Sequence, residues 1–243
     1  MVRIPAGRFD MGSPAEEDGR RPDEGPMHRV VLRHVFALGK TEVTVKEFRV
    51  FAEATGYVTD AEKAGSCLTF VHHDEWQEAP GANWRSPGFP QTDTHPATCI
   101  SWNDARAYAA WLARRTGKRY RLPTESELEY VARAGSSGPW AWPGAAQASC
   151  LHANIADASV KPRFPTWTGV PCDDGALFTS PVASYLPNAF GLHDVIGNVY
   201  EWASDCYRER YDLGLPKGEC ATYARRGGSW LIHQVNARPA RRA

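Results

Sequence analysis

The chain has 243 residues, and 42% of them are hydrophobic, which is enough to bury the core of one large irregular domain or two small ones. Its 28 basic residues balance 28 acidic ones, so no net charge attracts nucleic acid or an anionic membrane. Apolar runs of transmembrane length are absent from the sequence, and the start at Met1-Val2-Arg3-Ile4-Pro5 lacks the pattern of a signal peptide. We therefore expect no nucleic-acid partner and no membrane span.

Two stretches near the start are typical of β-strands. They cover residues 8–12 and 28–43, and the second is rich in β-forming side chains such as Val30 and Leu32. A polar segment at 13–26 separates them, and its proline, glycine and glutamate content predicts a loop.

Three helices are predicted from their start and stop signals. The first begins at the capping box that opens with Thr44 and ends at Gly56. The second begins after Ser101 and ends at Gly117, with apolar residues at helical spacing between them. A third begins at the capping box of residues 124–127 and ends near Gly135.

Two long segments, 60–98 and 136–185, show little periodicity and are predicted to be mostly irregular. The first contains His72-His73-Asp74, which is either a metal-binding patch or a solvated loop.

The cysteines are even in number and none is part of a CxxC pair, so a zinc ribbon is not expected. Six cysteines allow fifteen sets of three disulfides. Cys150 and Cys172 flank one predicted loop, and Cys206 and Cys220 flank another. This arrangement favours disulfides between cysteines that are neighbours in the sequence. Paired cysteines predict an extracytoplasmic protein, whereas six reduced, buried thiols would predict a cytoplasmic one.

The run from Pro187 to Trp202 concentrates glycines and oxygen donors. Gly191 and Gly197 permit tight turns, and the four donors are Asn188, Asp194, Asn198 and Glu201. Oxygen atoms that converge on a turn are what a hard cation needs. The run is either such a cation site or a turn that enters a buried strand ending at Trp202.

This run, together with Arg121-Leu122-Pro123-Thr124-Glu125 and Arg226-Gly227-Gly228-Ser229-Trp230, resembles the formylglycine-generating enzyme (sulfatase-modifying factor) family. The similarity extends from Phe9 to Trp230. It implies one α+β domain over residues 1–243 with a C-type-lectin-like fold that is loop-rich and has little regular structure. Family domains continue to a Gly-Phe-Arg strand, so we expect that the C-terminal strand is missing here and that the basic tail at 238–242 is solvated.

The resemblance implies two calcium sites. The first would use the Asn154 side chain, the Ile155 carbonyl, the Asp174 side chain and the Ala176 carbonyl. The second would use Asp194 and Glu201 side chains with the carbonyls of Gly197 and Val199. Aspartate replaces the family's usual asparagine at position 194, which keeps an oxygen donor and adds charge.

The resemblance fails at the catalytic centre. Family enzymes activate oxygen at copper held by two cysteine thiolates, in a segment of the form Gly-Gly-Ser-aromatic-x-Cys-His-x-x-x-Cys. Here Ile232 and Ala237 occupy the cysteine positions, and only Ser229 and His233 remain. Because neither isoleucine nor alanine binds copper, we expect no copper and no catalytic residue in this segment.

We therefore expect a non-oxidising family member whose C-terminal groove binds a peptide, a protein or another ligand. The predicted contacts are Trp230, His233, Gln234, Asn236 and Arg238. A related hypothesis is a variable protein diversified by a retroelement, which has this fold. The alternative is an oxidase that converts a sulfatase cysteine to formylglycine, or a related oxygenase.

Overall fold

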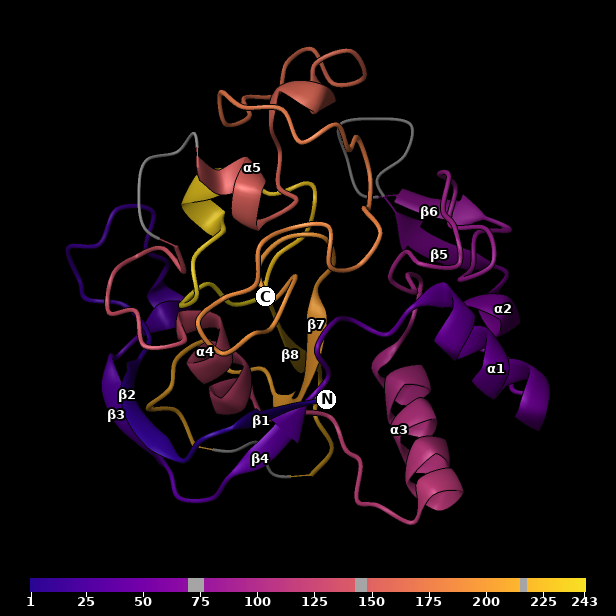
Figure 1. Ribbon diagram of the computed structural model, residues 1–243, viewed down its shortest axis with the longest axis horizontal. Helices are drawn as coiled ribbons and strands as arrows, with labels where there is room; N and C mark the ends of the chain where they lie inside the picture. The colour runs from indigo at the N-terminus through magenta and orange to yellow at the C-terminus, as the bar shows by residue number, and fades with distance from the viewer. Residues whose placement is uncertain (70–76, 143–147, 215–217) are drawn as a thin grey trace. The chain divides into compact units, whose positions relative to one another are not determined.

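The computed structural model describes residues 1–69, 77–142, 148–214 and 218–243 (Figure 1). The His72-His73-Asp74 group lies outside the described residues. Within the described chain, none of the helices has the length and apolar character needed to span a membrane. The chain divides into two compact units: unit 1 comprises Met1–Glu42, Pro123–Leu177 and Ala183–Ala243, and unit 2 comprises Val43–Leu122 and Phe178–Val182.

The described strands of unit 1 form short antiparallel pairs. These are β1 (Val2–Ile4) with β4 (Phe36–Leu38), β2 (Gly7–Met11) with β3 (His28–Leu32), and β7 (Glu201–Cys206) with β8 (Tyr223–Arg226). The stretch predicted as one strand over 28–43 is two strands, because the chain bends at His34 and changes partner from β2 to β1. The strand expected to end at Trp202 instead begins at Glu201.

Helix α4 (Glu125–Arg133) is the longest helix described in unit 1. Its capping box is as predicted, with Thr124 accepting from the Glu127 amide. It ends one residue early, at Ala134, whose φ of 43° lies in the left-handed region. The helix packs against β7 and β8 (Figure 1). The other helical segments described in this unit are η1 (Pro22–Glu24), α5 (Ser149–His152), η3 (Ala158–Val160) and η4 (Gln234–Asn236).

Unit 2 contains two helices that the capping signals predicted correctly, α1 (Val45–Thr55) and α3 (Trp102–Thr116). Its core is aromatic, with the buried side chains of Phe48, Phe51 and Trp84 in contact. The prediction of an irregular 60–98 segment was wrong in its first part. That part holds α2 (Asp60–Ala64), β5 (Ser66–Thr69) and β6 (Gln77–Pro80).

All six cysteines form disulfides between sequence neighbours, as predicted. The pairs are Cys67–Cys99, Cys150–Cys172 and Cys206–Cys220. They close loops of unequal length, with sequence separations of 32, 22 and 14 residues. Cross-links of this kind stabilise mainly by restricting the unfolded chain.

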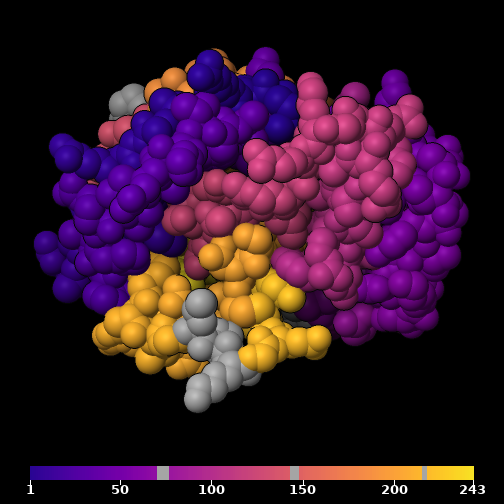
Figure 2. All heavy atoms as spheres, turned by 90° about the horizontal axis from the view of Figure 1, so that it is seen from below, coloured from indigo at the N-terminus to yellow at the C-terminus, as the bar shows by residue number. Residues whose placement is uncertain are grey.

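The C-terminal segment is part of the core of unit 1, and the prediction of a solvated basic tail was wrong. Arg238 and Arg242 are each only 1% exposed and pair with buried glutamates. The last residue, Ala243, exchanges two backbone hydrogen bonds with Arg225 on β8. The orange and yellow atoms of the last part of the chain gather in one area of the face shown in Figure 2. We call the buried Arg226, Arg238 and Arg242, with the glutamates that they contact, the arginine network.

Candidate functional site

The run at 194–201 folds as an irregular turn that leads into β7. Asp194, Gly197 and Asn198 all have positive φ, at 59°, 84° and 56°. A side chain at Gly197 would meet the Asn154 carbonyl oxygen at 2.3 Å, so this position requires glycine. The turn is held by the bond from the Asn198 amide to that same carbonyl, at 2.8 Å.

Three carboxylates lie close together at this turn, and we call Glu42, Asp194 and Glu201 the carboxylate cluster. Burial raises the pKa of all three. The charge of Asp194 raises the pKa values of Glu42 and Glu201 further. The pKa of Glu201 reaches about 8. Like charges in a desolvated site disfavour ionisation. No arginine or lysine is among the groups that set these pKa values, so in the absence of a cation the three acids favour their protonated form.

The donor set of this cluster fits a hard divalent cation. Asp194 is 3% exposed, and its Oδ2 accepts from the Ala183 amide at 2.7 Å. Its Oδ1 is buried and has no hydrogen-bond partner among the described residues. Glu42 instead accepts from the Asn198 side chain at 2.7 Å and from the Val199 amide at 3.2 Å. An unsatisfied carboxylate oxygen beside a second acid is suited to calcium, which takes only oxygen ligands.

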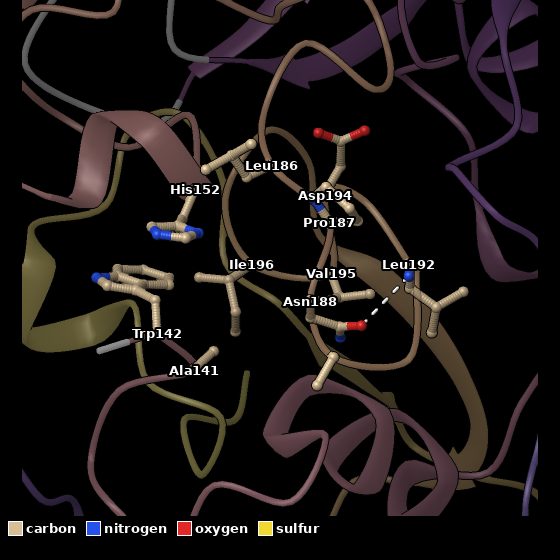
Figure 3. Close-up of a pocket in the computed structure, with 11 residues that line it drawn as sticks. Ala141, Trp142, His152, Leu186, Pro187, Asn188, Leu192, Asp194, Val195 and Ile196 are labelled. Atoms are coloured by element: carbon tan, nitrogen blue, oxygen red, sulfur yellow. Dashed lines mark hydrogen bonds between the residues drawn. The ribbon is translucent and has the colours of Figure 1, made fainter. Parts of the chain in front are cut away.

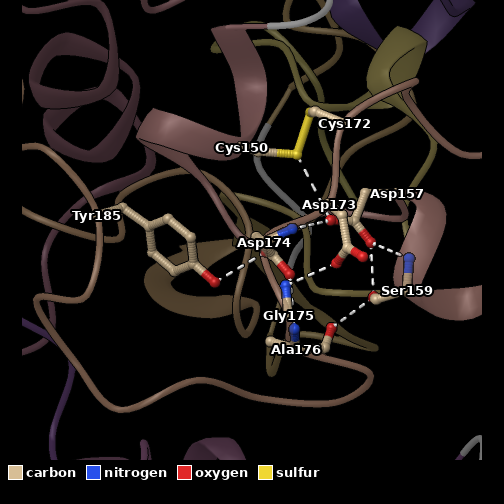
Figure 4. Close-up of a disulfide and its surroundings, with 9 residues drawn as sticks. All are labelled: Cys150, Asp157, Ser159, Cys172, Asp173, Asp174, Gly175, Ala176 and Tyr185. Carbon is tan, nitrogen blue, oxygen red and sulfur yellow. Dashed lines mark hydrogen bonds between the residues drawn. A yellow bond between two sulfur atoms is a disulfide. The ribbon is translucent and has the colours of Figure 1, made fainter.

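A second acidic group lies on the loop closed by the Cys150–Cys172 disulfide (Figure 4). Asp157, Asp173 and Asp174 each place one oxygen within 4.8 Å of the others. Asp157 is fully buried and accepts from the Asp174 amide at 2.6 Å. Burial raises the pKa of Asp174 to about 6, as expected where negative groups crowd a poorly solvated loop.

The four ligands expected for the first calcium site occupy two neighbouring segments. Asp174 accepts from the Ala176 amide at 2.8 Å and from the Tyr185 hydroxyl at 2.8 Å. Asn154 and Ile155 are each 1% exposed. Asp157 connects the segment that contains Ile155 to the segment that contains Asp174. It follows Ile155 by two residues, and its carboxylate accepts from the Asp174 amide. Five of the six oxygens of the three aspartates already accept hydrogen bonds, so this group is more nearly satisfied than the carboxylate cluster.

The two positions at which the resemblance led us to expect copper-binding cysteines, Ile232 and Ala237, are apolar and packed. Ala237 is fully buried in the main core of unit 1, and Ile232 packs against that core. The Cδ1 atom of Ile232 also approaches Gly228 so closely that a side chain there would clash, at 2.0 Å. Every cysteine of the chain is in a disulfide, so no thiolate pair is present. The residues present therefore do not fit copper held by sulfur.

The five predicted ligand contacts fall into two groups. Trp230 and Arg238 are buried, at 6% and 1% exposed, and the guanidinium of Arg238 binds Glu24 at 2.6 Å and also contacts Glu17. Arg238 is thus part of the arginine network and does not face a ligand on the surface. His233 is exposed, and Gln234 and Asn236 are half-buried.

A cavity of about 170 Å³ lies beside the carboxylate cluster (Figure 3). Its walls are mostly apolar, and the rings of Trp142 and His152 stack with an interplanar angle of 4°. Asp194 lines it from the other side, with its carboxylate pointing away from both rings. Burial lowers the pKa of His152, so its ring is neutral near pH 7.

The sequence interpretation missed several charged residues of these sites. The sequence analysis singled out neither Glu42 nor Asp157 as a candidate site residue. Both act on residues that are distant in sequence, since Glu42 binds Asn198 and Asp157 binds Asp174. The burial of these acids and their contacts depend on the fold, so the local sequence contains no signal that would have found them.

Fold and site together define a loop-rich α+β domain of C-type-lectin-like type with carboxylate-rich turns. A family profile described as sulfatase-modifying factor enzyme 1-like domain matches residues 1–243. The chain is 38% identical to the formylglycine-generating enzyme of Streptomyces coelicolor over 265 residues, which cover 96% of this chain and 79% of that protein. It therefore belongs to the formylglycine-generating enzyme (sulfatase-modifying factor) family.

Other similarities follow the same pattern. The chain is 35% identical over 255 residues to inactive C-alpha-formylglycine-generating enzyme 2 of Mus musculus, with 95% of this chain and 74% of that protein covered. The structure of PvdO from Pseudomonas aeruginosa matches with a TM-score of 0.81 at 36% identity, over all of this chain and 86% of that one. Treponema denticola variable protein 1 matches with a TM-score of 0.66 at 18% identity, over all of this chain and 88% of that one, which shows a shared fold alone.

Proposed function

We propose that this chain is a non-oxidising member of its family, a scaffold that binds a peptide or another ligand beside residues 230–242. One observation carries the proposal. Ile232 and Ala237 fill the positions where the family holds copper, and every cysteine is consumed by a disulfide. Soft thiolates are what retain Cu(I) in proteins.

The two polar residues left in the segment do not replace a dithiolate. Ser229 is buried and its hydroxyl has no hydrogen-bond partner among the described residues. The Nδ1 atom of His233 accepts from the Val235 amide at 3.3 Å, which leaves one ring nitrogen. One imidazole and one hydroxyl make a weak site for a soft monovalent ion.

The exposed part of this segment is the part that we propose contacts the ligand. His233 caps η4, and Gln234 and Asn236 lie within that short helix. Their side chains are at least partly accessible, so they offer donors and acceptors to a docked molecule. The same three positions are those that a retroelement-diversified variable protein would vary, and the shared fold with Treponema denticola variable protein 1 is compatible with that version.

We further propose that calcium stabilises the scaffold. Asp194 and Glu201 would hold one ion with the carbonyls of Gly197 and Val199, while Glu42 supplies charge next to it. Asn154, Ile155, Asp174 and Ala176 would hold another, with Asp157 positioning Asp174. The ion would neutralise the carboxylates and bind only the folded state. Since all six cysteines are paired, we also propose an extracytoplasmic location.

The alternative function is oxidation of a sulfatase cysteine. It is favoured by the identity of 38% to the enzyme from Streptomyces coelicolor. It requires copper to bind without sulfur at Ile232, or a disulfide elsewhere to open and supply two thiolates.

To distinguish the scaffold from the oxidase, the protein is incubated with Cu(I), oxygen and a Cys-x-Pro-x-Arg peptide, and the mass of the peptide is then measured. We expect an unchanged mass. The matched control is the double variant Ile232→Cys/Ala237→Cys, which restores both sulfur positions on the same scaffold. Aldehyde formation by the native chain would establish the alternative, whereas formation by the double variant alone would show that the lost sulfurs account for the inactivity.

A further inference from the structure

A group of positive side chains surrounds Tyr200, where the turn enters β7. The guanidinium of Arg225, on β8, lies 5.4 Å from the Tyr200 ring centre and 5.4 Å from that of Trp202. Its backbone is fixed by two hydrogen bonds to Ala243. Arg21 and Arg241 lie close enough for their charges to act on Tyr200 as well.

Arg241 is the member of this group whose charge is least satisfied. Its Nε and Nη1 atoms are buried and have no hydrogen-bond partner among the described residues. Burial and the charge of Arg21 lower its pKa, although a guanidinium stays protonated at any physiological pH. A desolvated cation without an acceptor is unfavourable. The neighbouring residue Arg242, in the arginine network, differs because its guanidinium donates to both carboxylate oxygens of Glu125.

The nearest carboxylates are already engaged elsewhere. Asp23 lies 3.4 Å from the Arg21 Nε atom and accepts from the Tyr207 hydroxyl at 2.7 Å. Glu24 is bound to Arg238 at 2.6 Å. The charges of Asp23 and Glu24 also act on Arg241, and Asp23 Oδ1 is buried without a hydrogen-bond partner among the described residues. Neither acid forms an ion pair with Arg225 or Arg241 among the described residues; their ion pairs are with Arg21 and Arg238.

Tyr200 adds a neutral donor to the same place. A tyrosine hydroxyl has an ordinary pKa of about 10 and keeps its proton at neutral pH. That hydroxyl has no hydrogen-bond partner among the described residues. A protonated phenol beside guanidinium groups is a typical setting for an oxygen anion.

The group lies against the segment proposed to bind the ligand. The Gly197 amide donates to the Gly227 carbonyl at 2.9 Å, and the Trp230 amide donates to the Asn198 carbonyl at 3.0 Å. These bonds hold the Gly-Gly-Ser-Trp segment beside the turn that carries Tyr200.

We propose that Arg241, Arg225, Arg21 and Tyr200 form a binding site for an oxyanion, the carboxylate, sulfate or phosphate group of the ligand. The inference rests on the proposed ligand-binding function and specifies the chemistry of that ligand. The anion would accept from the Nε and Nη1 atoms of Arg241, which have no hydrogen-bond partner among the described residues, and its charge would offset the surrounding guanidinium groups.

The test titrates the full chain with sodium sulfate, sodium phosphate and sodium acetate by calorimetry, at constant ionic strength set with sodium chloride. We expect saturable binding of at least one of these anions, and the three titrations separate tetrahedral anions from a carboxylate. In Arg241→Gln, binding should weaken by about tenfold or more, as expected for loss of a charge-assisted contact. The control variant Arg29→Gln removes an exposed arginine paired with Asp10 and should bind as the native chain does.

A second readout does not depend on the anion. Without added anion, Arg241→Gln should melt at a higher temperature than the native chain, because an unsatisfied buried charge is removed. If Arg241→Gln does not fold, Arg225→Gln takes its place in the titration. Equal anion binding by the native chain and these variants, or no binding at all, would overturn the site. The peptide assay remains separate: oxidation of the peptide alongside anion binding would refute the proposed function and leave the anion site standing.

Discussion

Two sets of buried charge in unit 1 differ in how they are neutralised. In the arginine network, every buried guanidinium meets carboxylates: Arg226 reaches Glu129 at 2.7 Å, Arg238 binds Glu24, and Arg242 binds Glu125. In the carboxylate cluster, Glu42, Asp194 and Glu201 face one another with no arginine or lysine among the groups that set their pKa values.

The network joins parts of the chain that are far apart in sequence. Arg242 also donates to the carbonyl oxygens of Asp23 and Arg208, at 2.6 and 2.8 Å. Arg238 reaches across more than two hundred positions to Glu24. Each guanidinium of this network has a carboxylate partner within the protein, so its role is to tie the N-terminal loop and the C-terminal segment to α4.

The carboxylate cluster, by contrast, is incomplete. Either its acids stay protonated at a pH where exposed carboxylates would be ionised, or they bind a shared cation. The comparison teaches that burial of charge is not itself a sign of function. What distinguishes a binding site from a structural contact is whether the protein supplies the opposite charge.

The largest expected effect comes from breaking the network. Arg242→Met leaves the buried Glu125 with only Arg226, 3.3 Å away, and leaves two carbonyls without a donor. We expect a loss of about 3–5 kcal/mol in the free energy of unfolding, measured by urea titration. The control is Arg29→Met at an exposed pair, which should lose at most about 1 kcal/mol. Equal losses in the two variants would mean that the network is not structural.

Calcium should produce the next largest effect. At about 100 times its dissociation constant, a ligand that binds only the folded state adds about 2.7 kcal/mol. For a chain of this size, that corresponds to a rise of roughly 5–10 °C in the melting midpoint relative to EGTA. Glu201→Gln should lose the part of that rise that comes from the site at 194–201 and keep the part that comes from the site at Asp174. A midpoint that calcium leaves unchanged in the native chain would remove the ion from both proposed sites.

The smallest effect is a pH dependence of the calcium-free chain. The pKa of Glu201 is raised from 4.5 to about 8, with burial as the main cause and Asp194 as the second. The folded chain then holds a proton that the unfolded chain releases, so stability should fall as pH rises from about 4.5 to about 8. Denaturant titrations in EGTA at several pH values would detect this slope. The slope should be weaker in Glu201→Gln and with calcium present; a native chain whose stability rises over that window would contradict it.

Local signals in the sequence were sufficient for part of the fold. Capping boxes located α1 and α4, and a serine followed by a regular apolar stripe located α3, because these signals involve residues within a few positions of one another. The same signal was present but overlooked at Thr59, whose capping box with Glu62 starts α2. The strands β5 and β6 lack an alternating apolar pattern, since their side chains are mostly exposed or half-buried.

Long-range charge pairing could not be predicted. The tail at 238–242 contains three arginines in five residues, a composition typical of a solvated end. Its burial depends on Glu24 and Glu125, which lie more than one hundred residues away. For the same reason the sequence indicated Asp194 and Glu201 but not Glu42, whose side chain reaches the turn from the other end of the chain.

We propose above all that this chain lacks the metal of the family's oxidase centre. The most direct measurement is a competition titration of Cu(I) against a strong Cu(I) chelator, for the native chain and for Ile232→Cys/Ala237→Cys. We predict that the native chain takes no copper from the chelator and that the double variant takes up to one ion per chain. One tightly bound Cu(I) per native chain, with oxygen consumed when the cysteine peptide is added, would contradict the account.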